Sequence, residues 1–383
     1  MVRSMRELIE MLRSSTQFDD HRALVEAMER VRRRADPTTI RAVLEAARPH
    51  PWWHEVTQVL PGAHVLEAVR VLLPGLNYRD LDLTLHKPRR HVDGWMRDLY
   101  LFPDETLSTV GVVVGSLRAA VAISEMTRPD RARISSIATY LRDDNEDEDA
   151  IEALLSTLHF DGVTSARPTD PGHAVAMVLR CPSLAEFYGP ITRDVAEALA
   201  TSSVSAIHAW SLGAGALPLL ARVPFLTTFT LPYDHQVDLL ELVPFPRLTE
   251  LQIFGRWLCD ETAAVLSKIA TLERLMIHGH PISNAESLAK LSRLRALDLH
   301  RTKITDRTLR SLATMPALAE LDVLGTPITP AGISAFKGSS VRRIGLSWQD
   351  KELAEAAHLA GLEVVTDSSE GPSTSIGGAI WWK

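Results

Sequence analysis

Residues 294–317 read LRALDLHRTKITDRTLRSLATMPA, and residues 318–340 read LAELDVLGTPITPAGISAFKGSS. Leu294 and Leu318, which are 24 residues apart, each begin an apolar triplet with the spacing LxxLxL. Such a triplet indicates a short strand with one buried face, because successive side chains of a strand point to opposite sides. Repetition of the same unit at a fixed interval predicts a solenoid, to which each repeat adds one strand.

The apolar triplet recurs on both sides of these two stretches. Successive triplets begin 21 to 24 residues apart, which agrees with the ~20–29 residues of repeats that alternate a strand and a helical segment. The regular triplets begin at Val204, Leu226, Leu248, Leu272, Leu294, Leu318, Val341 and Leu362.

A second pattern follows the strands at a fixed offset. It consists of an apolar residue, a small polar residue and a residue that favours the start of a helix, such as Asp306 or Pro330. The polar residue is suited to cap the helix that follows, and proline suits the first helical turn. Two patterns in one register predict a strand followed by a helix in each repeat. The polar residues are Cys259, Ser283, Thr305 and Thr329.

Together the two patterns resemble the leucine-rich repeat family, in particular its bacterial members with LDLxxTxIT repeats. The resemblance covers roughly residues 204–365, judged by the repeat template. It implies an α/β solenoid with a curved parallel sheet on the concave side and helices on the convex side. Where the commonest repeats carry Asn, this chain has Arg256, His280, Thr302 and Thr326. We therefore expect some of the hydrogen bonds between strand and loop to be made differently.

Upstream of Val204 the triplets are less regular. The signal at Leu184 is supported by Thr192, which precedes a helical pattern as the polar residues of the regular repeats do. A separate helical domain is the alternative for this stretch. Candidate strands begin at Tyr78, Leu107, Ile134, Leu155 and Leu184.

The two ends of the chain differ from the repeats. Three amphipathic helical patterns near the N-terminus, one of which begins at Asp36-Pro37, would cover the open end of a solenoid. The last residues are rich in Gly and Ser, as flexible linkers are, and end in Trp381-Trp382-Lys383. We expect four parts: a helical N-terminal cap (1–75), degenerate leucine-rich repeats (76–203), regular leucine-rich repeats (204–366) and a flexible C-terminal tail (367–383).

Composition restricts the class of function. The 383 residues include 41 basic and 48 acidic side chains, for a net charge of -7, which disfavours binding to nucleic acid. Cys181 and Cys259 cannot form a disulfide framework, which favours a reducing compartment. The charged start of the sequence does not suit a signal peptide, and no apolar run has the ~18 residues of a membrane span. We expect a cytoplasmic monomer, bacterial by resemblance only.

The outward positions of the strands form the expected binding surface. If the first, fourth and sixth residues of each strand point inward, then the third, fifth and seventh residues face out along the concave sheet. Solenoids generally bind their partners there, and exposed aromatic side chains are typical interface anchors. The candidate binding residues are Tyr188, His208, Trp210, Phe254, His278, Asp298, His300 and Asp322.

The histidines and aspartates of this set are residue types that can form a metal site. His278 and His300 fall in one row, and Asp298 and Asp322 fall in the next, so that two imidazoles and a carboxylate could hold a transition metal. No HxxxH or HExxH spacing fixes these ligands on one element. We expect a hydrogen-bonded polar patch, and neither a metal nor another cofactor.

Motifs for catalysis are missing from the sequence. It contains no Walker motif, dinucleotide fingerprint or GxSxG elbow. The favoured interpretation is a non-enzymatic scaffold that binds a protein partner through its concave face. The alternative is a hydrolase or ligase-like effector, with an active site in the N-terminal region and repeats that select the substrate. Its available residues are His54, Glu55, His64 and His86.

Overall fold

The computed structural model of the chain describes residues 160–366 apart from four positions, together with two helices and four strands further upstream. The chain divides into two compact units, Met1–Ala185 and Glu186–Lys383. The four positions left out are Asp234, His235, His278 and Trp348.

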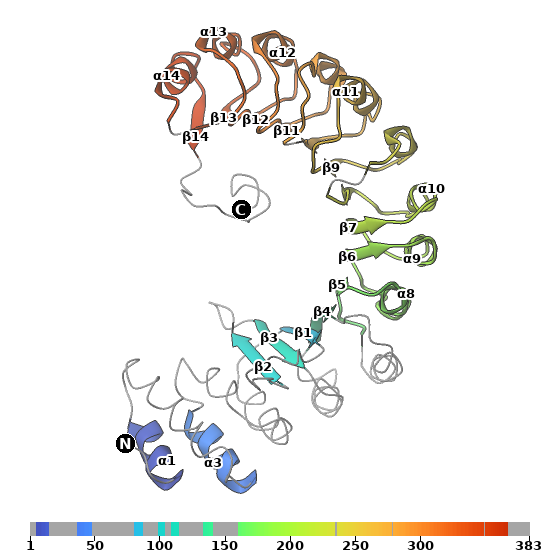
Figure 1. Cartoon of the computed structure of the whole chain (residues 1–383), viewed down its shortest axis with the longest axis vertical. Coiled ribbons are helices and arrows are strands. Elements are labelled where there is room, and N and C mark those ends of the chain that lie inside the picture. The colour runs from blue at the N-terminus through green and yellow to red at the C-terminus, as the bar shows by residue number, and fades with distance from the viewer. Residues whose placement is uncertain are drawn as a thin grey trace. The chain divides into compact units, whose positions relative to one another are not determined.

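The second unit is built from repeats of a strand and a helical segment (Figure 1). Its strands pair in parallel, each with the next along the chain, in the order β6 to β14. The strands line the inner side of the curve, and the helices lie on its outer side. The strands are β6 (Glu186–Ile191), β7 (Ala206–Leu212), β8 (Thr228–Thr230), β9 (Glu250–Gln252), β10 (Arg274–Met276), β11 (Ala296–Asp298), β12 (Glu320–Asp322), β13 (Arg343–Leu346) and β14 (Glu363–Thr366).

The helical segments of this unit are short, as the repeat length requires. Most are α-helices, and η5 and η6 are 3₁₀ turns. They are α9 (Arg193–Leu199), α10 (Leu217–Leu220), η5 (Leu239–Leu242), α11 (Asp260–Leu266), η6 (Glu286–Lys290), α12 (Asp306–Leu312), α13 (Pro330–Ser334) and α14 (Lys351–Leu359).

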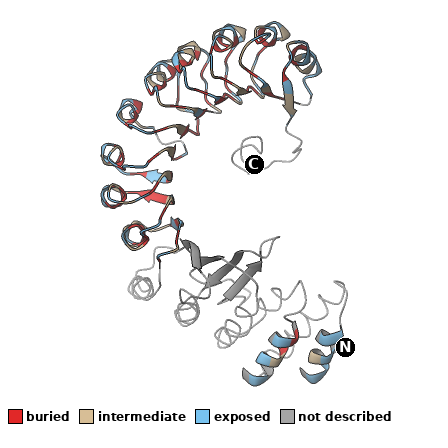
Figure 2. Cartoon of the chain, turned by 180° about the vertical axis from the view of Figure 1, so that it is seen from behind, coloured by how far each residue is buried: buried red, intermediate tan, exposed pale blue. Residues whose placement is uncertain are grey.

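The register of the strands agrees with the apolar triplets. Leu251, Leu275, Leu297 and Leu321 are Cα partners on consecutive strands, and their side chains are at most 2% exposed. Figure 2 shows buried residues between the strands and the helices of each repeat. Burial of one leucine side chain stabilises the fold by ~1.5–3 kcal/mol. The predicted leucine-rich repeat architecture is therefore confirmed for this unit.

The polar residues before the helices occupy the expected positions but bond differently. Thr305 and Thr329 are the N-caps of α12 and α13, yet neither side chain accepts a hydrogen bond from its helix. Thr329 instead donates its backbone N–H and its hydroxyl to the carboxylate of Asp306 in the preceding repeat. Ser283 binds Asp260 in the same way. The expected side-chain cap is therefore absent at Thr305 and Thr329, and the hydroxyls of Thr329 and Ser283 instead donate to an aspartate of the preceding repeat.

Thr302 and Thr326 occupy the position where asparagine is usual, and each makes a hydrogen bond within its own repeat. The hydroxyl of Thr302 donates to the carbonyl of Leu299 over 2.7 Å, and that of Thr326 donates to the carbonyl of Val323 over 2.7 Å. Each hydroxyl closes the turn that leaves the strand. The expectation that these hydrogen bonds are made differently is confirmed at both positions.

His280 occupies the same position in its repeat, but its hydrogen bonds reach the preceding repeat. Its side chain is fully buried. Nδ1 accepts the backbone N–H of Leu258 over 3.2 Å, and Nε2 lies 3.1 Å from the carbonyl oxygen of Ile253. Since Nδ1 accepts a hydrogen bond here, the ring proton is on Nε2, which donates a hydrogen bond to the carbonyl oxygen of Ile253. The imidazole thereby satisfies two buried backbone groups of the preceding repeat.

The first unit contains strands β1 (Asp80–His86), β2 (Leu99–Pro103), β3 (Thr109–Val114), β4 (Arg133–Tyr140) and β5 (Ser165–Pro168). β1, β3 and β4 lie where the triplets at Tyr78, Leu107 and Ile134 predict strands. β1 pairs in parallel with both β3 and β4, and β2 pairs antiparallel with β3. This order differs from that of a solenoid, in which each strand pairs with the next.

The strand predicted to begin at Leu155 should include Phe160, and this part of the prediction is wrong. Phe160 is buried but lies in a loop, and the next strand is β5. Asp161 and Gly162 follow Phe160 and form a turn, as this dipeptide commonly does. The chain then continues through α8 (Pro171–Arg180), whose first N–H groups bind the Asp170 carboxylate.

Two helices are described near the N-terminus, α1 (Met5–Ser14) and α3 (Pro37–Ala47). The start of α3 at Pro37 confirms the helix expected there, and proline suits this first position. The other two expected helices and the expected tail lie outside the described residues, and the four-part division of the chain stays a prediction. Among the helices that the structure describes, none is long and apolar enough to cross a lipid bilayer.

Candidate functional site

We call the outward side chains of β6–β14 the concave face, and they form two rows. The first row comes one residue before the central inward residue of each strand, and the second row comes one residue after it. The second row is the more buried of the two. The first row is Glu186, Ala206, Thr228, Glu250, Arg274, Ala296, Glu320, Arg343 and Glu363; the second is Tyr188, His208, Thr230, Gln252, Met276, Asp298, Asp322, Gly345 and Val365.

A ring stack begins the second row. Tyr188 on β6 and His208 on β7 are Cα partners, and their rings stack with centroids 4.2 Å apart and planes 9° apart. The Tyr188 hydroxyl donates to Glu186 Oε2 over 3.1 Å. Both rings are half-buried. The structure thus brings two of the predicted binding residues into direct contact.

Hydrogen bonds continue the row across the next two strands. The Thr230 hydroxyl donates to Gln252 Oε1 over 3.2 Å, and Gln252 Nε2 donates to Glu250 Oε1 over 2.9 Å. His208 Nδ1 lies 2.8 Å from Thr230 Oγ1. Because the hydroxyl proton of Thr230 points to Gln252, the hydroxyl oxygen of Thr230 accepts a hydrogen bond from His208 Nδ1. Thr230 and Gln252 were not among the predicted site residues, although their place in the row could have identified them.

Trp210 projects from an irregularity in β7. Ala209 pairs with Gly189 and Ser211 pairs with Pro190, so that Trp210 is the extra residue of a bulge. A bulge re-aims the side chain that it carries. Trp210 is 45% exposed, and Tyr233, which follows the neighbouring strand β8, is 67% exposed. The expected exposure of Trp210 is confirmed, while Tyr233 falls outside the expected rows because it lies beyond the end of its strand.

The burial of Phe254 shows that the prediction of an outward-facing side chain is wrong at this position. Its side chain is only 8% exposed and cannot serve as an accessible anchor. β9 ends at Gln252, so the alternation of the strand does not reach Phe254, and Ile253 and Phe254 are both buried. His300 likewise lies beyond the end of β11 and is half-buried. His278, the remaining member of this row in the prediction, lies outside the described residues.

Asp298 and Asp322 lie side by side on β11 and β12. They are 7% and 5% exposed. Asp298 Oδ1 accepts the backbone N–H of His300 over 2.8 Å, and Asp322 Oδ1 accepts that of Leu324 over 2.9 Å. Each carboxylate thereby fixes the chain as it leaves the strand. Two predicted binding residues are brought together here, and both face the concave side.

Glycine at position 345 makes room for one of these carboxylates. Gly345 is the Cα partner of Asp322 on β13. A Cβ atom at this glycine would lie 2.7 Å from the carboxyl carbon of Asp322, which is closer than nonbonded carbon atoms approach. The absence of a side chain at position 345 therefore allows Asp322 to lie across β13.

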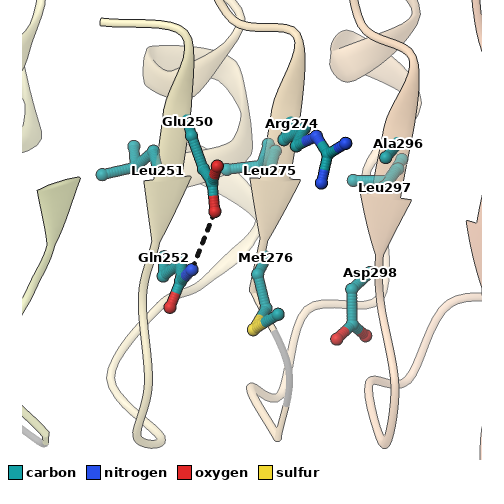
Figure 3. A pocket seen from close by; sticks show the side chains of 9 residues that line it. All are labelled: Glu250, Leu251, Gln252, Arg274, Leu275, Met276, Ala296, Leu297 and Asp298. Atoms are coloured by element: carbon teal, nitrogen blue, oxygen red, sulfur yellow. Dashed lines mark hydrogen bonds between the residues drawn. The ribbon is translucent and has the colours of Figure 1, made fainter. Parts of the chain in front are cut away.

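A shallow cavity opens on the concave face over β9, β10 and β11 (Figure 3). Its volume is about 30 Å³, far below the ~300–1,000 Å³ of pockets that enclose small-molecule ligands. The cavity is therefore too small to enclose such a ligand. Its lining residues are Glu250, Leu251, Gln252, Arg274, Leu275, Met276, Ala296, Leu297 and Asp298.

A metal-binding group or a reactive thiol would be a further kind of site among the described residues. In the part of the chain with described side chains, no three His, Cys, Asp or Glu residues are grouped to hold a metal ion. Cys181 is buried, and this burial raises the pKa of its thiol to about 12, whereas Cys259 is exposed. The side chains of His54, Glu55, His64 and His86, named for the enzymatic alternative, are outside the described residues.

Comparisons with known proteins concern the fold alone. No protein-family profile matches this sequence, and no curated protein matches it. An internalin (inlF) from Listeria monocytogenes is similar with a TM-score of 0.40 and 15% identity, over 66% of this chain and 76% of that chain. Internalin C2 from the same organism gives a TM-score of 0.34 and 17% identity, over 51% and 84% of the two chains.

A third solved structure is that of TLR13 in complex with ssRNA13. Its TM-score is 0.35 with 13% identity, over 56% of this chain and 42% of that chain. At these low scores the fold of this chain rests on its own strands, helices and buried leucines.

Proposed function

We propose that this leucine-rich repeat protein is a non-enzymatic scaffold that binds a protein partner through the concave face of its second unit. The observation that carries the proposal is the exposure of Trp210, the extra residue of a bulge in β7. Tryptophan is the residue most enriched among those that dominate binding energy in interfaces. We therefore assign the binding of a protein partner to Trp210, a large exposed ring beside an ordered sheet surface.

The surroundings of Trp210 support this proposal. The neighbouring ring stack and hydrogen-bonded row hold Tyr188, His208, Thr230 and Gln252 in fixed positions. A surface that is ordered before binding loses less conformational entropy on association. The small volume of the cavity over β10 also favours a protein partner over a small molecule.

We further propose that the chain acts as a monomer in the cytoplasm. Cys181 and Cys259 are both free thiols, and Cys259 is exposed. Free thiols are usual in a reducing compartment. Sedimentation of the purified chain at increasing concentration would show a constant molecular mass if the chain is a monomer, and a rising mass would contradict it.

The experiment begins with capture of partners from native cells by the intact chain. A captured partner is then titrated against the parent chain and the Trp210→Ala variant. We expect Trp210→Ala to weaken binding by ~2 kcal/mol or more, as truncation of an interface tryptophan does, while the melting temperature stays unchanged. Leu359→Ala is the control, because Leu359 is 75% exposed on α14 at the outer side. Equal affinity of the parent chain and Trp210→Ala would contradict the proposal.

A further inference from the structure

Positive charge is concentrated in the loops that lead from a helical segment to the next strand. In the second unit these loops contain seven basic residues and one acidic residue, whereas the loops that lead from a strand to the next helical segment contain three of each. The chain as a whole carries a net charge of -7, so this surplus of positive charge is local. The seven basic residues, which we call the basic edge, are Arg222, Arg247, Lys268, Arg293, Arg295, Lys337 and Arg342.

The loops that carry the basic edge lie side by side. Because the strands that they enter are parallel, all of them reach the sheet at the same edge. Backbone hydrogen bonds also join one loop to the next. The N–H of Thr249 donates to the carbonyl of Thr227 over 2.9 Å, and the N–H of Glu273 donates to the carbonyl of Thr249 over 2.8 Å. The same bond continues from Arg295 to Glu273 over 2.7 Å. The basic edge therefore belongs to loops whose backbone is fixed before a ligand binds.

Helix dipoles do not account for this charge. A basic residue is stabilised by the C-terminus of a helix only near the last turn. Arg247, Arg295 and Arg342 lie at least five residues beyond the ends of their helical segments and close to the next strand. Their charges therefore require another explanation. The helical segments before them end at Leu242, Lys290 and Ser334.

Little of the charge on the basic edge is compensated. All seven residues are exposed. Within the described part of the chain, Glu273 is the only acidic residue paired with the basic edge, and it lies 3.8 Å from Arg295 Nε. Arg342 donates to the carbonyls of Ser339 and Val341. Since five of the seven residues are arginines, whose planar guanidinium can bind a carboxylate with two parallel N–H groups, the edge suits a ligand with several carboxylates.

Apolar side chains are exposed at one end of the basic edge. Phe225 is 51% exposed and Val243 is 37% exposed, and they lie in the neighbouring loops that carry Arg222 and Arg247. The guanidinium carbon of Arg247 lies 5.7 Å from the centroid of the Phe225 ring. Aromatic residues and arginine are enriched in interfaces between proteins. The combination of cations with an apolar contact favours a polypeptide ligand.

We infer that the basic edge binds an acidic, extended segment of a partner protein. Carboxylates of the segment pair with the arginines, and one apolar side chain of the segment contacts Phe225 and Val243. The edge crosses five strand spacings from β8 to β13, about 24 Å, which about seven residues of an extended segment cover. Nucleic acid is less favoured, because the acidic charge of the rest of the chain repels a long polyanion. The inference is separate from the proposed function, which concerns the concave face.

The test uses the full chain and a displayed library of short random peptides. Peptides that bind the parent chain are selected, and those that also bind the Arg247→Glu/Arg293→Glu variant are then removed. We expect the remaining peptides to be enriched in Asp and Glu over the input library and to carry an apolar residue among them. A selection that leaves no peptide, or peptides without an excess of acidic residues, would overturn the inference.

Two double variants with the same change in net charge locate the contact. One selected peptide is synthesised and titrated against each. Arg247→Glu/Arg293→Glu should weaken its binding about ten-fold or more, because each substitution replaces an attraction by a repulsion. Lys303→Glu/Arg310→Glu is the control, since both residues are exposed and outside the basic edge; it should leave the affinity within about two-fold. Equal losses would show a general charge effect and would contradict the assignment to the edge.

A further variant tests the apolar contact. Phe225→Ala should weaken the selected peptide about five-fold through the loss of apolar contact area. Added salt should reduce the effect of Arg247→Glu/Arg293→Glu, because salt screens exposed charges, and should leave the effect of Phe225→Ala unchanged. Thermal melting of each variant reports folding. Full affinity of Phe225→Ala, or an effect of the double variant that salt does not reduce, would overturn the inference.

The remaining outcomes distinguish other ligands and the proposed function. A single-stranded oligouridylate and vesicles that contain phosphatidylserine are tested on the same chain. Tight binding of either one that is lost in Arg247→Glu/Arg293→Glu, together with a peptide selection that yields no acidic sequence, would assign the edge to nucleic acid or to a membrane and overturn the inference. If Trp210→Ala weakens the native partner but the selection leaves no peptide specific for the edge, the proposed function stands and the inference fails.

Discussion

Asp260 at the start of α11 binds Ser283 of the next repeat with both of its carboxylate oxygens. Oδ1 accepts the Ser283 backbone N–H over 2.7 Å, and Oδ2 accepts its hydroxyl over 2.7 Å. Asp306 and Thr329 repeat the arrangement two repeats further on. The sequence separation is 23 residues in both cases. These two pairs of consecutive repeats are therefore joined on the helical side by side chains, as they are joined on the other side by the sheet.

The first prediction concerns the pH dependence of the stability that Asp260 provides. Burial alone would raise the pKa of its carboxyl group, but hydrogen bonds from Asn284 and Ser283 outweigh burial and lower the pKa below its ordinary value of 3.8. A carboxyl whose pKa is lower in the folded state stabilises the fold above its unfolded pKa, and this contribution is lost as the pH falls through the folded value. We expect the difference in unfolding free energy between the parent chain and Asp260→Asn to be greatest at neutral pH and to shrink below pH 3.8.

Urea unfolding of both proteins across the acid range measures this difference. Glu352→Gln is the matched control, since Glu352 is exposed on α14, and its small effect should not follow the same pH profile. A constant difference between the parent chain and Asp260→Asn at all pH values would contradict the assignment of the pKa shift to the bonds with Ser283 and Asn284.

The second prediction tests the two faces of one strand. Leu297 is fully buried at the centre of β11, so Leu297→Ala should lower the unfolding free energy by ~2–5 kcal/mol. Asp298→Asn keeps an oxygen that can accept the His300 N–H, and its loss should stay below about 1 kcal/mol. Arg295→Ala, on the exposed residue two positions before Leu297, is the control. Similar losses for Leu297→Ala and Asp298→Asn in thermal melts would mean that the faces of the strand are exchanged.

The third prediction concerns the buried imidazole of His280. Replacement by alanine leaves the Leu258 N–H and the Ile253 carbonyl buried without this partner, and each such group costs ~1–3 kcal/mol. His280→Ala should therefore lower the unfolding free energy by at least ~2 kcal/mol. His280→Asn offers an acceptor and a donor of similar reach and should recover part of the loss. Equal stability of the two variants would show that the imidazole acts through its volume alone.

The fourth prediction distinguishes the two cysteines by their reactivity. Because burial raises the pKa of the Cys181 thiol to about 12, almost none of it is thiolate at neutral pH, and the thiolate is the reactive form. A thiol reagent should modify only Cys259 in the folded chain, and modification of Cys181 should require unfolding. Mass spectrometry of the parent chain and of Cys259→Ser measures this. Rapid labelling of the folded Cys259→Ser variant would contradict the burial of Cys181.

The sequence predicts the second unit well because its core repeats a simple physical rule. Leu297 and Leu321 are 24 residues apart and become partners on adjacent strands. The prediction fails where a strand ends early, as at Phe254, because alternation of side chains holds only within a strand. It also fails at Thr329, since the sequence does not reveal whether the hydroxyl oxygen will accept a hydrogen bond from its own helix or the hydroxyl will instead donate to an aspartate of the preceding repeat.

The candidate site was predictable in part. The pairing of Tyr188 with His208 and of Asp298 with Asp322 follows from the repeat register. The hydrogen bonds of Thr230 and Gln252 depend on side-chain conformations that the register does not specify. The outward direction of Trp210 follows the expected row, whereas the bulge that leaves this residue without a partner is a local irregularity without a sequence signal of its own.

Gly345 has a consequence for how this chain can evolve. Since a Cβ atom at position 345 would meet the Asp322 carboxyl group, position 345 cannot gain a side chain while the Asp322 side chain keeps its place. A relative that carries alanine at position 345 should carry a smaller residue than aspartate at position 322. In an alignment of relatives the two positions should therefore covary, although they lie in different repeats and 23 residues apart.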